Sequence, residues 1–153
     1  MAEIIRFYSV SEEYGHFSNF AGFSIDLDGR TWPTSEHYFH AQKFKEREHQ
    51  EAIRKTASPM IAARMGRDRK KPLRKDWESV KVSVMRKAVL AKFSQHAELC
   101  EELLATGDAK IVEHTERDDY WGDGGDGSSK NMLGRILMEV REALRKEVAT
   151  GEV

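Results

Sequence analysis

The sequence predicts an α+β fold that is predominantly α-helical, with short N-terminal strands and a hairpin followed by a helical bundle with one small sheet. Apolar residues alternate in short runs before residue 33, and after it they recur at spacings of three and four. The 153 residues, of which 39% are hydrophobic, suit one domain with a substantial core. Because no internal repeat or low-complexity linker interrupts them, we expect a single domain over residues 1–153.

The first third of the chain contains the predicted strands. Residues 4–8 form one extended run, and residues 23–27 form a second in which apolar residues alternate. The dipeptide Asp28-Gly29 is typical of a tight turn, and residues 30–32 form the returning strand. We therefore expect a hairpin before the first helix.

Two short helices are predicted from their caps. Thr34 or Ser35 can cap a helix over about residues 35–44, whose first turn carries a carboxylate that the helix dipole favours. Ser58, followed by proline and later by glycine, predicts a second helix over about residues 59–65.

The second half of the chain is predicted to be mostly helical. Residues 78–93 carry apolar positions at helical spacing, and residues 99–104 continue this character. The last helix, over about residues 131–148, has one continuous apolar stripe and is expected to pack centrally. A short strand is expected at residues 110–114.

Composition narrows the class of protein. No apolar run approaches the roughly 20 residues that a membrane-spanning helix needs, and the N-terminus does not read as a secretory signal. Cys100 is the only cysteine, so neither an internal disulfide nor a cysteine zinc site can form. We expect a cytoplasmic protein. A net charge of −1 gives no overall attraction to nucleic acid, so anions must be bound by local clusters.

The helix over residues 35–44 carries the first candidate site. Helical spacing places Glu36, His40 and Lys43 on one face, where a carboxylate, an imidazole and an amine converge. Aromatic neighbours can shift the pKa of such groups, which favours a functional site. The alternative is an exposed helix face with an ordinary ion pair.

The second candidate is the glycine-rich segment over residues 118–131. Backbone amides before a helix can hold an anion, and Ser128, Ser129 and Lys130 can add donors. Trp121 offers a stacking surface beside it. The alternative is a solvated turn, and the aspartates lack the spacing of a calcium-binding EF-hand loop, so no metal is expected.

The third candidate is the basic run over residues 64–75, which ends beside Trp77. Cations such as Arg64 and Arg67 next to an aromatic ring suit a phosphate and a base. The alternative is a solvated loop.

Near the N-terminus, Tyr8 and Asn19 lie among aromatic residues and are candidates for a base- or ribose-recognising wall. A hydrophobic cluster with incidental polar residues is an equal alternative.

Several motifs appear in an order and spacing that resemble the YbiA-like, or NADAR, family over about residues 7–144. They are Phe7-Tyr8-Ser9, Phe17-Ser18-Asn19-Phe20, Trp32-Pro33-Thr34-Ser35-Glu36-His37-Tyr38-Phe39, Ala41-Gln42-Lys43-Phe44, Ala63-Arg64-Met65-Gly66-Arg67, Arg74-Lys75-Asp76-Trp77 and Tyr120-Trp121-Gly122-Asp123-Gly124. The resemblance implies an N-glycosidase of one or both of two kinds. One hydrolyses ribosylamino-pyrimidine phosphate intermediates of riboflavin synthesis, and the other removes ADP-ribose from guanine.

The resemblance also assigns roles. It places the important carboxylate at Glu36, the helix lysine at Lys43, and further functional positions at Trp77, Trp121 and Asp123, while Asn19 belongs to the ligand wall.

Breaking a ribosyl–nitrogen bond develops positive charge on the sugar carbon, which suits the carboxylate of Glu36. Lys43 can bind phosphate or attack the ring-opened sugar as an amine. Asp123 is expected to position water or a ribose hydroxyl. Arg64, Arg67 or the loop glycines Gly122 and Gly124 are expected to hold phosphate, the two tryptophans to stack, and no cofactor to be needed.

Two other functions remain open at this stage. A non-catalytic ADP-ribose or nucleotide reader would use the same residues for recognition alone, and it would bind without turnover. A nucleic-acid-binding module built on residues 64–75 would show steep salt dependence and would not need Glu36.

Overall fold

The structure is a computed structural model and describes residues 3–151. It consists of two compact units. One combines the chain up to Ala21 with the chain from Phe93 onward, and the other is the continuous segment Gly22–Lys92. Among the helices of the described part, none is long and apolar enough to cross a membrane. Each unit is described separately below.

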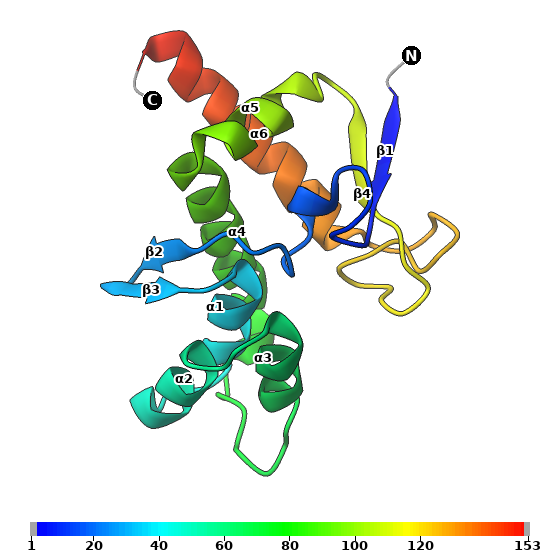
Figure 1. The fold of residues 1–153 in the computed structure, drawn as a ribbon. Coiled ribbons are helices and arrows are strands. Elements are labelled where there is room, and N and C mark those ends of the chain that lie inside the picture. Colours follow the sequence, from blue (N-terminus) through cyan, green and yellow to red (C-terminus); the bar gives the residue numbers. More distant parts are fainter. Residues whose placement is uncertain (1–2, 152–153) are drawn as a thin grey trace. The chain divides into compact units, whose positions relative to one another are not determined.

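The first unit joins the two ends of the chain through a two-stranded parallel sheet (Figure 1). Its elements are β1 (Ile4–Phe7), the 3₁₀ turn η1 (Gly15–Phe17), α5 (Ala97–Ala105), β4 (Lys110–Glu113) and α6 (Met132–Thr150). In the sheet Ile4 pairs with Lys110 and Arg6 pairs with Val112. Exposed and buried residues alternate along β1, whereas on β4 Ile111 and Val112 are both buried.

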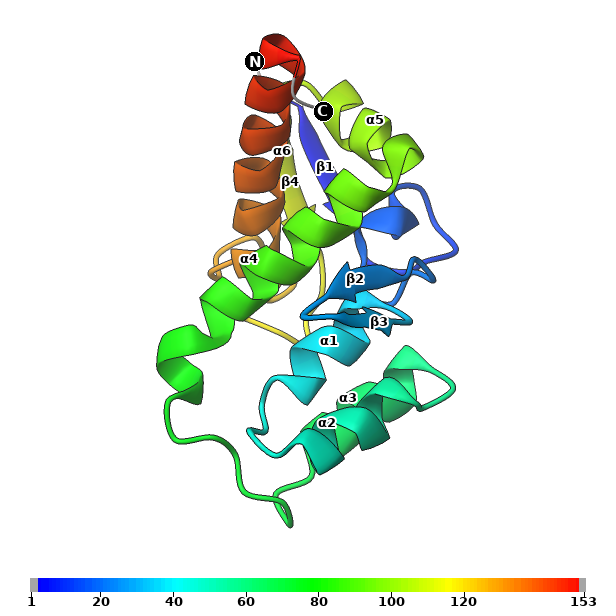
Figure 2. The ribbon, with the colours of Figure 1, turned by 90° about the vertical axis from the view of Figure 1, so that its left-hand side faces the viewer.

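Helix α6 runs beside β4, as Figure 2 shows. Gly134 allows this close approach, because a Cβ atom there would lie 2.1 Å from the carbonyl oxygen of Ile111. The apolar stripe of the helix, which includes Leu133, Leu137 and Leu144, is buried. Arg141 on the same helix donates to the carbonyl of Ala109 at 2.8 Å.

The second unit contains the hairpin and a group of short helices. Its elements are β2 (Ile25–Leu27), β3 (Arg30–Trp32), α1 (Ser35–Ala41), α2 (Arg47–Arg54), α3 (Pro59–Gly66) and the greater part of α4 (Trp77–Gln95). Helix α1 packs against both α2 and α3. Trp32, Tyr38 and Phe44 are almost fully buried and form the core together with smaller residues from the helices.

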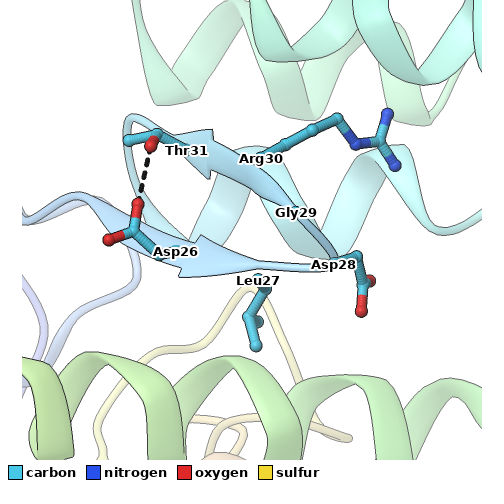
Figure 3. A pocket seen from close by; sticks show the side chains of 6 residues that line it. All are labelled: Asp26, Leu27, Asp28, Gly29, Arg30 and Thr31. Atoms are coloured by element: carbon cyan, nitrogen blue, oxygen red, sulfur yellow. Dashed lines mark hydrogen bonds between the residues drawn. The ribbon is translucent and has the colours of Figure 1, made fainter.

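The hairpin has the predicted turn. Asp28 and Gly29 have φ angles of 55° and 75°, which fit a two-residue turn of the kind that suits twisted strands. Beside it lies an open cavity of about 310 Å³, seen in Figure 3, where Thr31 donates a hydrogen bond to Asp26 at 2.6 Å. The Asp28 carboxylate accepts from the hydroxyl of Tyr38 at 2.9 Å, which fixes the hairpin to α1.

The predicted α+β, mainly helical class is confirmed. The strands form two separate two-stranded sheets rather than one, since β1 pairs with β4 and not with the hairpin. Helix α1 ends at Ala41, three residues earlier than expected, and α2 was not predicted. The Glu46 cap of α2 makes no side-chain hydrogen bond to the helix, so the sequence carried no start signal there.

Candidate active site

Helix α1 positions the carboxylate of Glu36 and the imidazole of His40, and Lys43 follows just beyond its end. Thr34 caps the helix by accepting a hydrogen bond from the backbone N–H of His37, as the sequence predicted. Every residue of α1 is buried, including Glu36 and His40. The alternative of an exposed helix face is therefore wrong for this segment.

Glu36 and His40 form a buried pair. The Nε2 atom of His40 lies 3.1 Å from Oε2 of Glu36, and the two residues are 3% and 7% exposed. Burial lowers the pKa of His40 although the hydrogen bond to Glu36 opposes the shift, so the ring is neutral at pH 7. Because a carboxylate only accepts, the ring proton is on Nε2. Within residues 3–151 the second carboxylate oxygen, Oε1, makes no hydrogen bond.

Gly66 fixes the position of the imidazole. A Cβ atom at this residue would lie 2.2 Å from Nδ1 of His40. Nδ1 is buried and has no hydrogen-bond partner within the described chain. The glycine ends α3 as the sequence predicted, but its role is close packing against His40.

Lys43 lies one turn beyond His40 and is 9% exposed. Its Nζ atom is 5.6 Å from the ring centroid of Phe39 and 5.9 Å from that of Trp77. Nζ makes no hydrogen bond or ion pair with any residue in the 3–151 range. Lys43 is thus a nearly buried amine with aromatic neighbours.

The pKa of Lys43 is lowered by desolvation and raised by attraction to Glu36. Burial is the largest effect, and repulsion from Arg69 and Arg67 adds to it. Attraction to Glu36 works in the opposite direction but is weaker, so the pKa of Lys43 falls to about 8. A substantial fraction of the amine is therefore neutral at physiological pH.

Trp77 is the first residue of α4 and is 5% exposed. Its ring packs edge-on against Phe39 with centroids 5.1 Å apart. It therefore forms part of the buried wall around Lys43.

The basic run begins in the last turn of α3, at Arg64, and continues into the loop after this helix. Arg64 and Arg67 are exposed. Arg69 instead donates to the carbonyl oxygen of Gly66, and Arg74 binds Asp76 through two nitrogens at 2.6 and 3.0 Å. Two arginines of the run, Arg69 and Arg74, therefore stabilise the conformation of this loop.

Asp123 lies in the first unit and is 2% exposed. Its Oδ2 atom is 2.7 Å from Nδ1 of His114, and Oδ1 accepts from the backbone N–H groups of Thr115 and Gly125. Burial would raise the pKa of Asp123, but these hydrogen bonds outweigh it and lower the pKa. The carboxylate is thus occupied in fixing the loop.

Most amides of the glycine-rich loop are used within it. The N–H of Gly124 donates to the carbonyl of Asp118, and that of Asn131 donates to the carbonyl of Gly122. A Cβ atom on Gly122 would lie 2.6 Å from the side chain of Thr115, so this glycine serves close packing. Of the two amides expected to hold phosphate, that of Gly124 is therefore already used within the loop, and the role of Gly122 stays a prediction.

The remaining predicted residues are also in the first unit. Tyr8 is 47% exposed, Asn19 is 7% exposed, and Trp121 is partly buried with its ring 4.9 Å from that of Tyr120. The second unit holds Glu36, Lys43, Arg64, Arg67 and Trp77. His114 was missed, because only the folded loop brings this histidine against Asp123.

No group of three histidine, cysteine, aspartate or glutamate residues in the described chain is arranged to hold a metal ion.

The NADAR domain matches residues 6–145. The chain belongs to the NADAR family. It is 67% identical over 144 residues to "N-glycosidase YbiA" of Escherichia coli, covering 94% of this chain and 90% of that one. The NMR structure of E. coli YbiA has a TM-score of 0.90, with 65% identity over 97% of this chain and 89% of that one.

More distant NADAR relatives carry related names. "N-glycosidase Npun_R5314" of Nostoc punctiforme is 44% identical, and the alignment covers 92% of this chain and 92% of that one. "Riboflavin biosynthesis protein VVA0006" of Vibrio vulnificus is 44% identical over 95% of this chain, which spans 40% of that protein. This chain is accordingly an enzyme, a hydrolase of N-glycosyl bonds. The relatives therefore do not support the alternative of a non-catalytic reader.

Proposed function

We propose that the enzyme hydrolyses the ribosyl–nitrogen bond of ribosylamino-pyrimidine phosphates, the intermediates of riboflavin synthesis. The observation that carries the proposal is a buried carboxylate with one unoccupied oxygen on α1 and a lysine of lowered pKa just beyond the end of that helix. The name of the Vibrio relative supports the substrate class.

Glu36 is suited to stabilise the positive charge that develops on C1 of the ribose. Its carboxylate is held by His40 at 3.1 Å, so one oxygen is fixed while the other can face the sugar. In a nearly dry environment a fixed charge interacts more strongly with a developing cation than it would in water.

Lys43 is suited to covalent catalysis. Opening of the ribose ring converts the N-glycoside to an imine between C1 and the substrate nitrogen. The neutral Nζ of Lys43 adds to C1, the pyrimidine amine leaves with a proton, and an imine between Lys43 and C1 remains. Water then adds to C1, which releases the sugar phosphate as an aldehyde and returns the free lysine.

Removal of ADP-ribose from guanine breaks the same type of bond and is the second candidate. Two exposed cations, Arg64 in the last turn of α3 and Arg67 directly after this helix, suit a diphosphate as well as a monophosphate. The two candidates differ in substrate and share the chemistry at Glu36 and Lys43.

Incubation of the purified protein with each substrate tests the proposal. We expect ribose 5-phosphate and the free pyrimidine amine to appear, both quantified by mass spectrometry. Release of ADP-ribose alone would select the second candidate, and release of neither product would refute both.

The Glu36→Gln variant tests the role of the carboxylate. It keeps an acceptor for His40 but removes the charge, so turnover should fall on the order of a hundredfold or more, while the fold and substrate binding persist. Glu48→Gln is the matched control, because Glu48 is exposed on α2. Near-normal turnover by Glu36→Gln would remove this residue from the mechanism.

Borohydride trapping tests Lys43. Reduction during turnover should convert the imine to a secondary amine and leave a sugar adduct on Lys43. The Lys43→Arg variant keeps the charge but cannot form the imine, so it should be inactive. If it stays active and no adduct forms, direct attack by water near Glu36 replaces the covalent route.

A further inference from the structure

A second cavity, of about 310 Å³, lies in the first unit and is lined by four cations: Arg6, Lys110, Lys130 and Arg135. None of these residues belongs to the proposed reaction. The cavity lies against β1, β4, the glycine-rich loop and the first turn of α6.

The sheet and the helix explain why these side chains converge. Ile4 pairs with Lys110, and Arg6 follows Ile4 by two positions, so Arg6 and Lys110 lie on the same face of the two-stranded sheet. Such diagonal neighbours are roughly 7–8 Å apart at their Cα atoms, within reach of one ligand for two long side chains. Arg135 lies one helical turn after Asn131, whose amide group holds the start of α6 to β4.

The charge in the cavity is uncompensated. Within residues 3–151 none of the four cations makes an ion pair, whereas Arg145, further along α6, has Asp108 and Glu142 as partners. The acidic residue in the lining is Asp123, and its oxygens already accept three hydrogen bonds. The cavity is therefore lined by four cations and one carboxylate, and that carboxylate is bonded to groups other than these cations.

The ligand would be held by side chains and not by backbone amides. The N–H groups of Lys130, Asn131 and Met132 all donate to carbonyls of the loop. The hydroxyl of Ser129 also lines the cavity and makes no hydrogen bond in the described chain, so it adds a neutral donor. Flexible cations around a space of this size suit a multiply charged oxyanion.

We propose that this cavity binds a phosphate group of a small phosphorylated molecule. The phosphate can come from the substrate of the enzyme or from a separate effector, and the chemistry of recognition is the same. The proposal does not depend on which N-glycoside is hydrolysed.

Titration of inorganic pyrophosphate, followed by calorimetry and by amide chemical shifts, tests the proposal. We expect binding that weakens with salt and shifts centred on Arg6, Lys110 and Arg135. Arg135→Gln should weaken binding roughly tenfold or more, because it removes a charged donor. Lys146→Gln, which changes the same charge at an exposed site of α6 outside the cavity, should bind as the unaltered protein does.

Equal affinity for pyrophosphate in the unaltered protein and Arg135→Gln, or no binding by the unaltered protein, would overturn the proposal. Arg135 is exposed on α6, so this substitution is not expected to disturb the fold, and a melting curve checks that. Lys110→Gln provides a second, independent loss of affinity from β4.

Substrate kinetics identify the source of the phosphate. If the substrate supplies it, pyrophosphate competes with the substrate and Arg135→Gln raises KM. If an effector supplies it, KM stays unchanged while pyrophosphate affinity falls. Both results keep the cavity as a phosphate site, and both are readable whichever N-glycoside proves to be hydrolysed.

Discussion

Replacement of Lys43 by methionine is expected to make the protein more stable at neutral pH while it abolishes turnover. The pKa of Lys43 falls from 10.5 to about 8. Since each unit corresponds to roughly 1.4 kcal/mol, carrying this charge in the folded state costs on the order of 3 kcal/mol. The two aromatic contacts of the ammonium, at 5.6 and 5.9 Å, offset a part of any gain from its removal. A gain of about 1–3 kcal/mol in the free energy of unfolding is therefore expected for Lys43→Met.

The sign of the pH dependence follows from the direction of the shift. Between about pH 8 and 10.5 the unfolded chain keeps the Lys43 proton that the folded protein has released, so stability rises with pH in this range. Below pH 8 both states are protonated and the folded state bears the full cost. The advantage of Lys43→Met should thus be largest at pH 7 and shrink by roughly half near pH 9.5.

Urea denaturation at pH 7 and at pH 9.5 measures both quantities. Lys45→Met is the matched control, because Lys45 is exposed two residues further along and should give little change. A Lys43→Met variant that is less stable than the unaltered protein at pH 7, or a difference that does not vary with pH, would refute the assignment of a desolvated amine.

Four further substitutions test the packing of the site and the loop. Gly66→Ala should cost about 2 kcal/mol or more and impair turnover, because its Cβ would displace His40, and thermal melting with an activity assay measures both. Trp77→Ala should cost about 3–5 kcal/mol in urea denaturation, whereas the partly buried Trp121 should cost clearly less and chiefly raise KM. Asp123→Asn should cost about 1–3 kcal/mol at pH 7. This difference should begin to shrink as the pH falls below 3.8, where the unfolded chain takes up the proton, and should vanish once the pH is below the lowered pKa of the folded protein.

These variants have controls and contrary outcomes. Gly22→Ala places a Cβ where no atom lies within 4 Å, so it should leave stability unchanged. Full activity in Gly66→Ala would show that the His40 position is not needed. Normal stability in Trp77→Ala, or equal stability of Asp123→Asn at all pH values, would contradict the packing and the hydrogen bonds described above.

Local signals in the sequence predicted local structure well. The caps at Thr34 and Ser58 and the turn at Asp28-Gly29 appear as expected, because each depends on residues within a few positions of one another. The pairing of β1 with β4 was not predictable, since more than a hundred residues separate Ile4 from its partner Lys110. The sequence of neither strand indicates which strand it pairs with.

In the candidate site, too, features that depend on local sequence were predicted and features that depend on the fold were not. Helical spacing was sufficient to pair Glu36 with His40 on α1. Lys43 lies beyond the end of this helix, and the aromatic density correctly indicated its desolvation. Three-dimensional packing was required to show that Trp77 is buried, that Gly66 makes room for an imidazole, and that Asp123 is bound by His114. The last contact depends on the fold of the loop, which alternating or helical patterns do not describe.

The parallel pairing of β1 with β4 has a consequence for protein synthesis. The ribosome makes β1 first, yet the partner strand emerges only after the whole continuous segment Gly22–Lys92 has left the tunnel. That segment can fold as it is made, because the residues of its core cluster all come from within it. Until residue 113 has left the tunnel, both edges of β1 lack a partner strand, and a nascent chain that stalls before this point exposes a strand open to pairing with other chains.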